Sequence, residues 1–184
     1  QCAPVLAGLK PANLFRHENR DRAAFYATVA GWDARLAPKG IRLLVLKECP
    51  HSHWSLVYLY RPAKLGAALA QPGVGAFLRR EGYALPSDPA SPAGCAQLLQ
   101  QLAGRLSCDG DFPHEIGVFL GYPLGDVEGF IANQGRNFTC CGCWKSYGDP
   151  DAARRHFAQL NKCTAVYLRL FHSGTPVLKL AVAA

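Results

Sequence analysis

The chain has 184 residues, of which 49% are hydrophobic and 18% charged, and its formal net charge is +7. This composition predicts a globular protein of one domain over residues 1–184 and excludes a disordered chain. No apolar run approaches the roughly 18 residues that a membrane-spanning helix needs. The first residues are too few, too lightly charged and too interrupted by proline to be a signal peptide. We therefore expect a cytoplasmic protein without a membrane partner.

The first half of the chain alternates between helix and strand patterns. Residues 21–40 are expected to form an amphipathic helix with Asp21 as its cap. Residues 41–49 and 53–62 read as two strands joined by a short turn. Residues 62–80 and 91–106 are predicted to be helices separated by a proline-rich connection.

The second half begins with two short helices over residues 114–131 and an irregular stretch over 140–149. A helix over residues 150–161 follows, with Asp149 as cap and Pro150 at its first position. Residues 164–183 read as a second hairpin. The sequence thus predicts an α+β fold: a mainly antiparallel sheet of about four strands, in two hairpins, covered by five or six helices.

The segment "HEIGVFLGYPLGDVEGFI", residues 114–131, has the layout of a helix-turn-helix corner with Gly121 at the positive-φ turn position. A DNA-reading second helix must present donors and positive charge. Residues 115–134 contain no Lys or Arg, and Asp126 and Glu128 take positions expected to be exposed. Sequence-specific DNA binding is therefore not expected. A protein or nucleic-acid interaction module remains an alternative, with charge supplied from elsewhere, for example by Arg136, Arg154 and Arg155.

A pair of candidate catalytic residues begins this corner. With Asp111 as N-cap, His114 and Glu115 fall in the first helical turn, where the helix dipole favours a neutral imidazole that can act as a base or a metal ligand. The alternative is that His114 caps or packs while Glu115 complements the dipole.

Cys2 is the candidate nucleophile. It precedes a predicted helix start, where a thiolate is stabilised and the thiol pKa lowered. Paired with His114 or His53 as base, it would make a thiol hydrolase-like enzyme, with Asn13 as a conceivable polar partner. The alternative is a half-buried cysteine near a chain end.

Three further cysteines lie close together, and a fourth follows one helix later. They are Cys140, Cys141, Cys143 and Cys163. Soft thiolates suit a transition metal such as zinc or iron. The spacing is unlike a paired zinc knuckle, because adjacent cysteines point apart in an extended chain. Reduced, unligated thiols in a cytoplasm are the alternative.

A set of aromatic residues and one lysine predicts a ligand pocket. Tyr122, Trp144, Lys145 and Tyr147 lie in or beside loops, where such side chains bind ligands or, equally, seal the core.

The motifs "CAPVLAGLKPANLF", "FPHEIGVFLGYPLGDVEGFI" and "CWKSYGD" together resemble a family of bacterial proteins, found mostly in anaerobes, that is known as a domain of unknown function. The resemblance covers nearly the whole chain. It implies a cytoplasmic bacterial protein and implies no activity, cofactor, partner or catalytic residue. Our leading hypothesis is a site for a ligand or transition metal, where His114, Glu115 and Cys2 converge with the aromatic residues and Lys145.

Overall fold

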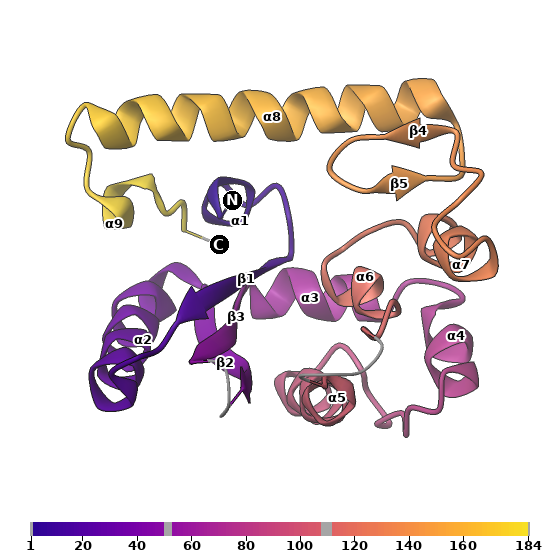
Figure 1. Ribbon diagram of the computed structural model, residues 1–184, viewed down its shortest axis with the longest axis horizontal. Helices are drawn as coiled ribbons and strands as arrows, with labels where there is room; N and C mark the ends of the chain where they lie inside the picture. Colours follow the sequence, from indigo (N-terminus) through magenta and orange to yellow (C-terminus); the bar gives the residue numbers. More distant parts are fainter. Residues whose placement is uncertain (1, 50–52, 108–111, 184) are drawn as a thin grey trace.

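The computed structural model describes residues 2–49, 53–107 and 112–183. Figure 1 shows a small sheet flanked by α2 (Arg22–Leu36), a group of short helices beside it, and the long helix α8 (Pro150–His172) lying across both parts. Mixed helices and antiparallel strands confirm the predicted α+β class.

The main sheet has three antiparallel strands in the order β1-β3-β2. The predicted hairpin is present as β2 (Arg42–Cys49) and β3 (Trp54–Tyr60). The sequence did not predict β1 (Ala12–Glu18), which pairs with β3 along its whole length. Its half-polar pattern fits an edge strand, whose stability comes from its neighbour rather than from its own residues.

Helix α2 covers one face of this sheet and contacts β2. The carboxylate of Asp21 accepts a hydrogen bond from the Ala24 backbone N–H at 3.0 Å, which confirms the predicted cap. A short 3-10 helix, η1 (Ala37–Lys39), ends at Gly40 with φ of 69°.

The other face of the sheet packs against a core formed by four helices. These helices are α3 (Pro62–Leu69), α4 (Val74–Arg80), α5 (Pro92–Arg105) and α6 (Ile116–Phe119). The predicted single helix over residues 62–80 is two helices because Pro72 and Gly73 interrupt it, and Gly73 has φ of 85°. In this core, the buried Tyr58 hydroxyl donates to the Phe119 carbonyl at 2.6 Å.

The predicted second hairpin over residues 164–183 is wrong. Helix α8 continues to His172, and α9 (Val177–Leu180) follows after a turn at Gly174. Thr164, Tyr167 and Leu168 lie on one face of α8. Their spacing of three and four residues fits a helix, although residue types such as Thr and Tyr favour strands. Within the part of the chain that the structure describes, none of the helices has the length and apolar character required to cross a membrane.

Arg61 joins the two ends of the chain. Its side chain is 2% exposed and donates to the carbonyls of Val5 at 2.7 Å, Leu6 at 2.8 Å and Val182 at 2.7 Å. The first two belong to α1 (Ala3–Leu6), so one buried guanidinium satisfies the carboxyl end of this helix and holds the C-terminal segment beside it.

Candidate functional site

The predicted helical corner is present, formed by α6 and α7 (Leu124–Ala132). Gly121 connects them with φ of 76°, as predicted, and a side chain at this position would overlap the Pro11 ring. The second helix of the corner differs from the expectation, because one of its two carboxylates is not exposed.

Asp126 is 6% exposed and organises the segment that follows α7. One oxygen accepts from the Trp144 indole N–H at 2.7 Å, and the other accepts from the Tyr147 backbone N–H at 2.7 Å and the Ser146 hydroxyl at 3.0 Å. A longer bond of 3.3 Å comes from the Gly148 N–H. These donors belong to the stretch predicted to be irregular, which contains the small hairpin of β4 (Cys140–Cys141) and β5 (Lys145–Ser146). Asp126 therefore attaches this hairpin to α7.

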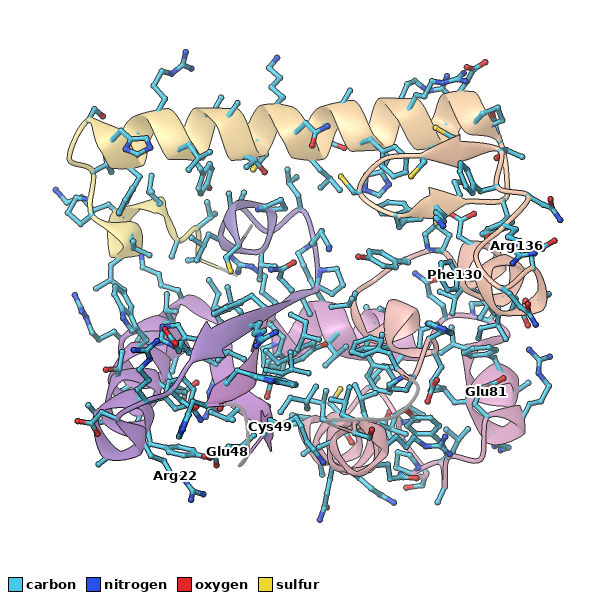
Figure 2. All side chains as sticks on the ribbon, viewed as in Figure 1. Arg22, Glu48, Cys49, Glu81, Phe130 and Arg136 are labelled. Atoms are coloured by element: carbon cyan, nitrogen blue, oxygen red, sulfur yellow. The ribbon has the colours of Figure 1, made fainter. Side chains whose placement is uncertain are left out.

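A cavity of about 390 Å³ lies between the corner and the hairpin. Its lining consists of Phe112, His114, Ile116, Gly117, Leu120, Tyr122, Asp126, Val127, Phe130, Cys141, Gly142, Cys143, Trp144 and Lys145. Figure 2 labels Phe130, which belongs to α7. Most of these residues are apolar or aromatic, which is typical of small-molecule sites of this size.

Aromatic rings contact one another around the cavity. Tyr122 and Trp144 are stacked with centroids 4.8 Å apart, and the Trp144 ring also meets Phe157 edge-on at 4.6 Å. His114 lies edge-on to Phe130 at 4.8 Å. Because these rings brace one another, the aromatic walls keep their orientation without a ligand.

The polar groups of the cavity leave an excess of hydrogen-bond donors. The Lys145 ammonium donates to the Gly135 carbonyl at 2.7 Å and lies 5.7 Å from the Phe130 ring centroid. An ammonium has three donors, so this bond does not exhaust its capacity. The carboxylate of Asp126 already accepts hydrogen bonds from four groups, so its capacity to accept another from a ligand is small. The His114 side chain is exposed and is open to a ligand.

Lys10 adds a cation next to these aromatic walls. Its ammonium lies 5.0 Å from the Tyr122 ring centroid. Burial lowers the pKa of Lys10, and the nearby Cys143 and Cys2 thiols act in the opposite direction. Burial also raises the pKa of the Tyr122 hydroxyl.

Cys2 is not among the residues that line the cavity. It is half-buried against the apolar cluster that contains Val5 and Leu6, and the Asn13 amide donates to its sulfur at 3.8 Å. Burial raises the pKa of Cys2, which outweighs the lowering by the N-terminal charge, by Asn13 and by Lys10. This direction is opposite to the lowered pKa that the sequence suggested, because α1 has four residues and the thiol is desolvated.

His53 lies at the other end of the sheet from Cys2. Its carbonyl accepts from the Asn19 N–H, whereas Cys2 contacts Asn13. The six residue steps from Asn13 to Asn19 span about 20 Å of extended chain. The structure therefore does not bring His53 to the thiol.

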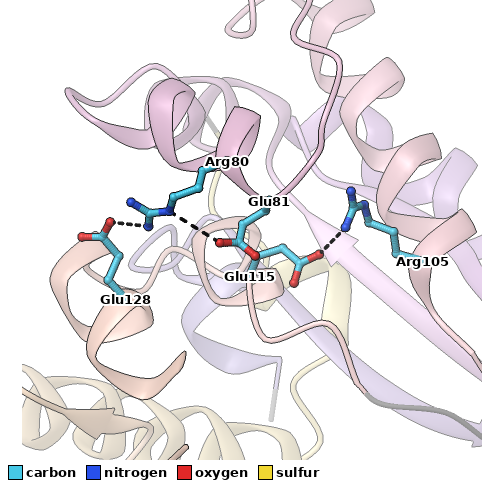
Figure 3. Close-up of polar contacts among 5 residues, drawn as sticks. All are labelled: Arg80, Glu81, Arg105, Glu115 and Glu128. Carbon is cyan, nitrogen blue, oxygen red and sulfur yellow. Dashed lines mark hydrogen bonds and ion pairs between the residues drawn. The ribbon is translucent and has the colours of Figure 1, made fainter. Parts of the chain in front are cut away.

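Glu115 has partners different from those of His114. It is 5% exposed, accepts from the Tyr83 hydroxyl at 3.1 Å and forms an ion pair with Arg105 at 3.5 Å. Burial and the Glu115 charge raise the pKa of Tyr83. Figure 3 shows this pair beside a second one, in which Arg80 binds Glu128 at 2.8 Å. Glu115 thus links α6 to α5. The predicted first helical turn at His114 and Glu115 is wrong, because α6 begins at Ile116 with Glu115 as its N-cap and His114 precedes it; the predicted cap, Asp111, lies outside the described residues.

The four cysteines considered as metal ligands separate into two groups. Cys141 and Cys143 line the cavity, and the Cys143 thiol donates to the Asn161 side chain at 3.8 Å. Cys140 is half-buried in β4, and burial raises the pKa of Cys163 on α8. Over residues 2–49, 53–107 and 112–183, no three His, Cys, Asp or Glu side chains are arranged to hold a metal ion.

Of the predicted ligand-binding residues, Tyr122, Trp144 and Lys145 line the cavity together with His114. Tyr147 instead packs against Gly129, where an added Cβ would lie 2.5 Å from the tyrosine ring. Sequence reasoning did not predict that Phe112 and Phe130 line the cavity, or that Asp126 holds the β4–β5 hairpin through hydrogen bonds. Asp126 and Trp144 are 18 residues apart, and no local pattern announces their contact. Catalytic roles for Cys2, His114, Glu115 and His53 stay predictions.

A larger hollow of about 510 Å³ lies between β1 and α2. Its charged groups are already in use, because Arg20 pairs with Glu18 at 2.8 Å and Asp21 caps α2. The cavity beside the hairpin is the better candidate, since donors without full partners meet aromatic walls there.

Comparison with known protein families identifies the family of this chain. A family model described as "Protein of unknown function (DUF3793)" matches residues 1–181. The chain belongs to this family. Membership in DUF3793 confirms the resemblance stated from the motifs, and it assigns no activity to the cavity. No curated protein and no solved structure matches the chain.

Proposed function

We propose that this DUF3793 protein binds a small planar aromatic molecule with an anionic group in the cavity between the α6–α7 corner and the β4–β5 hairpin. One observation carries the proposal: Lys145 and His114 border a cavity of about 390 Å³ whose walls include Tyr122, Phe130 and Trp144.

The walls favour a flat aromatic ligand. Aromatic side chains stack on or meet the edges of ligand rings with favourable geometry and large buried area. The volume lies within the range of about 300–1,000 Å³ that is typical of ligand sites. Ile116, Leu120 and Val127 add aliphatic surface that would exclude water from such a ring.

The charged groups around the cavity favour an anionic ligand over a cationic one. The Lys145 ammonium has donors to spare, and Asp126 has accepted its hydrogen bonds from the hairpin. The Lys145 ammonium would repel a cationic ligand, whereas a ligand carboxylate would gain a charge-assisted hydrogen bond from it. A metal is not part of this proposal, since the described residues offer no three suitable side chains in one place.

We also propose a cytoplasmic bacterial setting, which the family resemblance supports. The cysteines that the structure describes are free thiols, as a reducing compartment would keep them.

Isothermal titration of 2-naphthoate, with 2-naphthamide as the neutral isostere, tests the binding proposal. A probe of about 13 non-hydrogen atoms at about 0.3 kcal/mol each predicts a Kd of about 1 mM or lower. We expect the carboxylate to bind at least about tenfold more tightly than the amide, which corresponds to about 1.4 kcal/mol for one charged hydrogen bond.

Lys145→Met supplies the matched variant, because methionine keeps a long apolar stem and removes the charge. The preference for the carboxylate should largely disappear in this variant, while 2-naphthamide binding stays within about threefold. Equal binding of both probes to the wild type, or no binding of either at millimolar concentration, would refute the proposed ligand class.

A further inference from the structure

Helix α8 presents an unpaired row of basic side chains to solvent. Its inner side, which includes Phe157 and Leu160, packs on the rest of the protein and is buried. Arg155, Lys162 and Arg169 are all exposed. Figure 2 shows side chains that end in nitrogen atoms on the outer side of α8.

These three residues lie on one line along the helix. They are seven residues apart, and seven residues at 100° each fall only about 20° short of two turns. Their direction is roughly opposite to that of Phe157 and Leu160. At about 1.5 Å per residue, the row spans about 21 Å.

Among the described residues, no carboxylate forms an ion pair with this row. On α8 the acidic side chain is Asp151, which pairs with Arg154 at 2.8 Å. Within the described ranges, Arg155, Lys162 and Arg169 form no ion pair. Between them lie Ala158 and Ala165 on one side of the row and Gln159 and Val166 on the other, so no aromatic or acidic side chain separates the three cations.

We propose that the outer face of α8 binds the phosphate backbone of double-helical DNA without reading its sequence. A rigid row of cations fits a rigid polyanion, and contacts from arginine and lysine to phosphates hold a protein on DNA without reading its sequence. Among the exposed residues between the cations along the row, which are Ala158, Gln159 and Ala165, Gln159 alone carries a group that could hydrogen-bond to a base edge. This surface is separate from the α6–α7 corner, whose lack of basic residues argues against sequence reading, and it does not depend on the cavity ligand.

Two other polyanions fit the same face less well. Duplex RNA is recognised through its shape and through its 2′-hydroxyls as well as its phosphates, and a row of three cations with one amide, Gln159, offers few partners for the hydroxyls. An anionic membrane would also require a continuous apolar face to insert, whereas the exposed large apolar side chains of α8, which are Leu168, Leu170 and Phe171, are confined to its last turns.

Fluorescence anisotropy with a labelled 20-base-pair DNA, measured from 25 to 200 mM KCl, tests the proposal. Three phosphate contacts predict a contribution of about −2.7 to the slope of log K against log salt. The variant Arg155→Gln, Lys162→Gln, Arg169→Gln should lose about that contribution and bind at least about tenfold more weakly at 50 mM KCl. Glutamine keeps the helix propensity of lysine and arginine, and circular dichroism verifies the fold.

A control variant removes equal charge from other faces: Arg35→Gln on α2, Lys64→Gln on α3 and Arg79→Gln on α4. We expect it to retain DNA binding within about threefold. Three results would overturn the proposal: equal weakening by both triple variants, wild-type binding to duplex RNA or to phosphatidylserine vesicles more than threefold tighter than to DNA, and no DNA binding at 25 mM KCl.

Discussion

The contact between Asp126 and Trp144 is the first interaction to test, because it fixes the hairpin that forms one wall of the cavity. Asp126→Asn keeps the side-chain shape but places an amide N–H₂ or a neutral oxygen opposite the indole N–H. Trp144→Phe removes that N–H and keeps an aromatic ring in the stack with Tyr122.

The expected cost follows from the bonds. Hydrogen bonds to a charged group contribute about 1.5–3 kcal/mol, against about 0.5–1.5 kcal/mol for neutral pairs. Asp126→Asn would lose the indole bond and weaken those from Tyr147 and Ser146. We therefore expect a loss of about 3 kcal/mol in the free energy of unfolding, since such contributions are not fully additive.

Urea unfolding of the wild type, both single variants and the double variant gives the coupling energy of the pair. Unfolding is followed by circular dichroism, because one variant alters the tryptophan fluorescence. We predict a coupling of about 1.5 kcal/mol or more. If the two single changes add within about 0.5 kcal/mol, Asp126 does not hold the hairpin through Trp144 and the account of this wall is wrong.

Three further predictions concern the packing and ionisation of the fold. Gly129→Ala should lower the free energy of unfolding by about 1–3 kcal/mol, because the added methyl group would overlap Tyr147. The control Gly125→Ala, whose added methyl group meets nothing within 4 Å, should leave this free energy unchanged or raise it. Similar losses for both variants in urea unfolding would contradict this packing. Arg61→Met should cost about 3–5 kcal/mol by the same assay, because buried carbonyls lose a charged donor, and a loss below about 1 kcal/mol would show that the chain ends do not depend on it. Burial raises the pKa of Tyr122 above its ordinary 10.0, so its stabilising contribution is present below pH 10 and lost as pH rises through the folded pKa. Between pH 8 and 11, Tyr122→Phe should therefore flatten the decline in unfolding free energy, and parallel curves for the two proteins would argue against a buried hydroxyl.

Sequence reasoning succeeded where local signals were sufficient. The Asp21 cap, the β2–β3 hairpin and the positive φ of Gly121 follow from short-range rules of capping, alternation and turn chemistry. The C-terminal half of α8 was mistaken for strands because its β-branched and aromatic residues suit either structure, and the apolar face against α1 that decides the matter is not local.

The candidate site was partly predictable for the same reason. Tyr122, Trp144 and Lys145 were proposed from residue type and loop position, and His114 from its place near a helix start; all four line one cavity. The buried state of Asp126 could not be predicted, because an acidic residue in a first helical turn is usually exposed and its donors come from a segment 18 or more residues later.

The central claim is that an aromatic acid occupies the cavity beside Trp144, and the three indole N–H signals of the protein report on it directly. Trp144 lines the cavity, Trp32 lines the separate hollow between β1 and α2, and Trp54 begins β3. In a ¹H–¹⁵N NMR titration with 2-naphthoate, we predict that the Trp144 signal shifts and saturates with the Kd found by calorimetry, while the signals of Trp32 and Trp54 stay in place. A saturating shift of Trp32 with Trp144 unmoved would contradict the account.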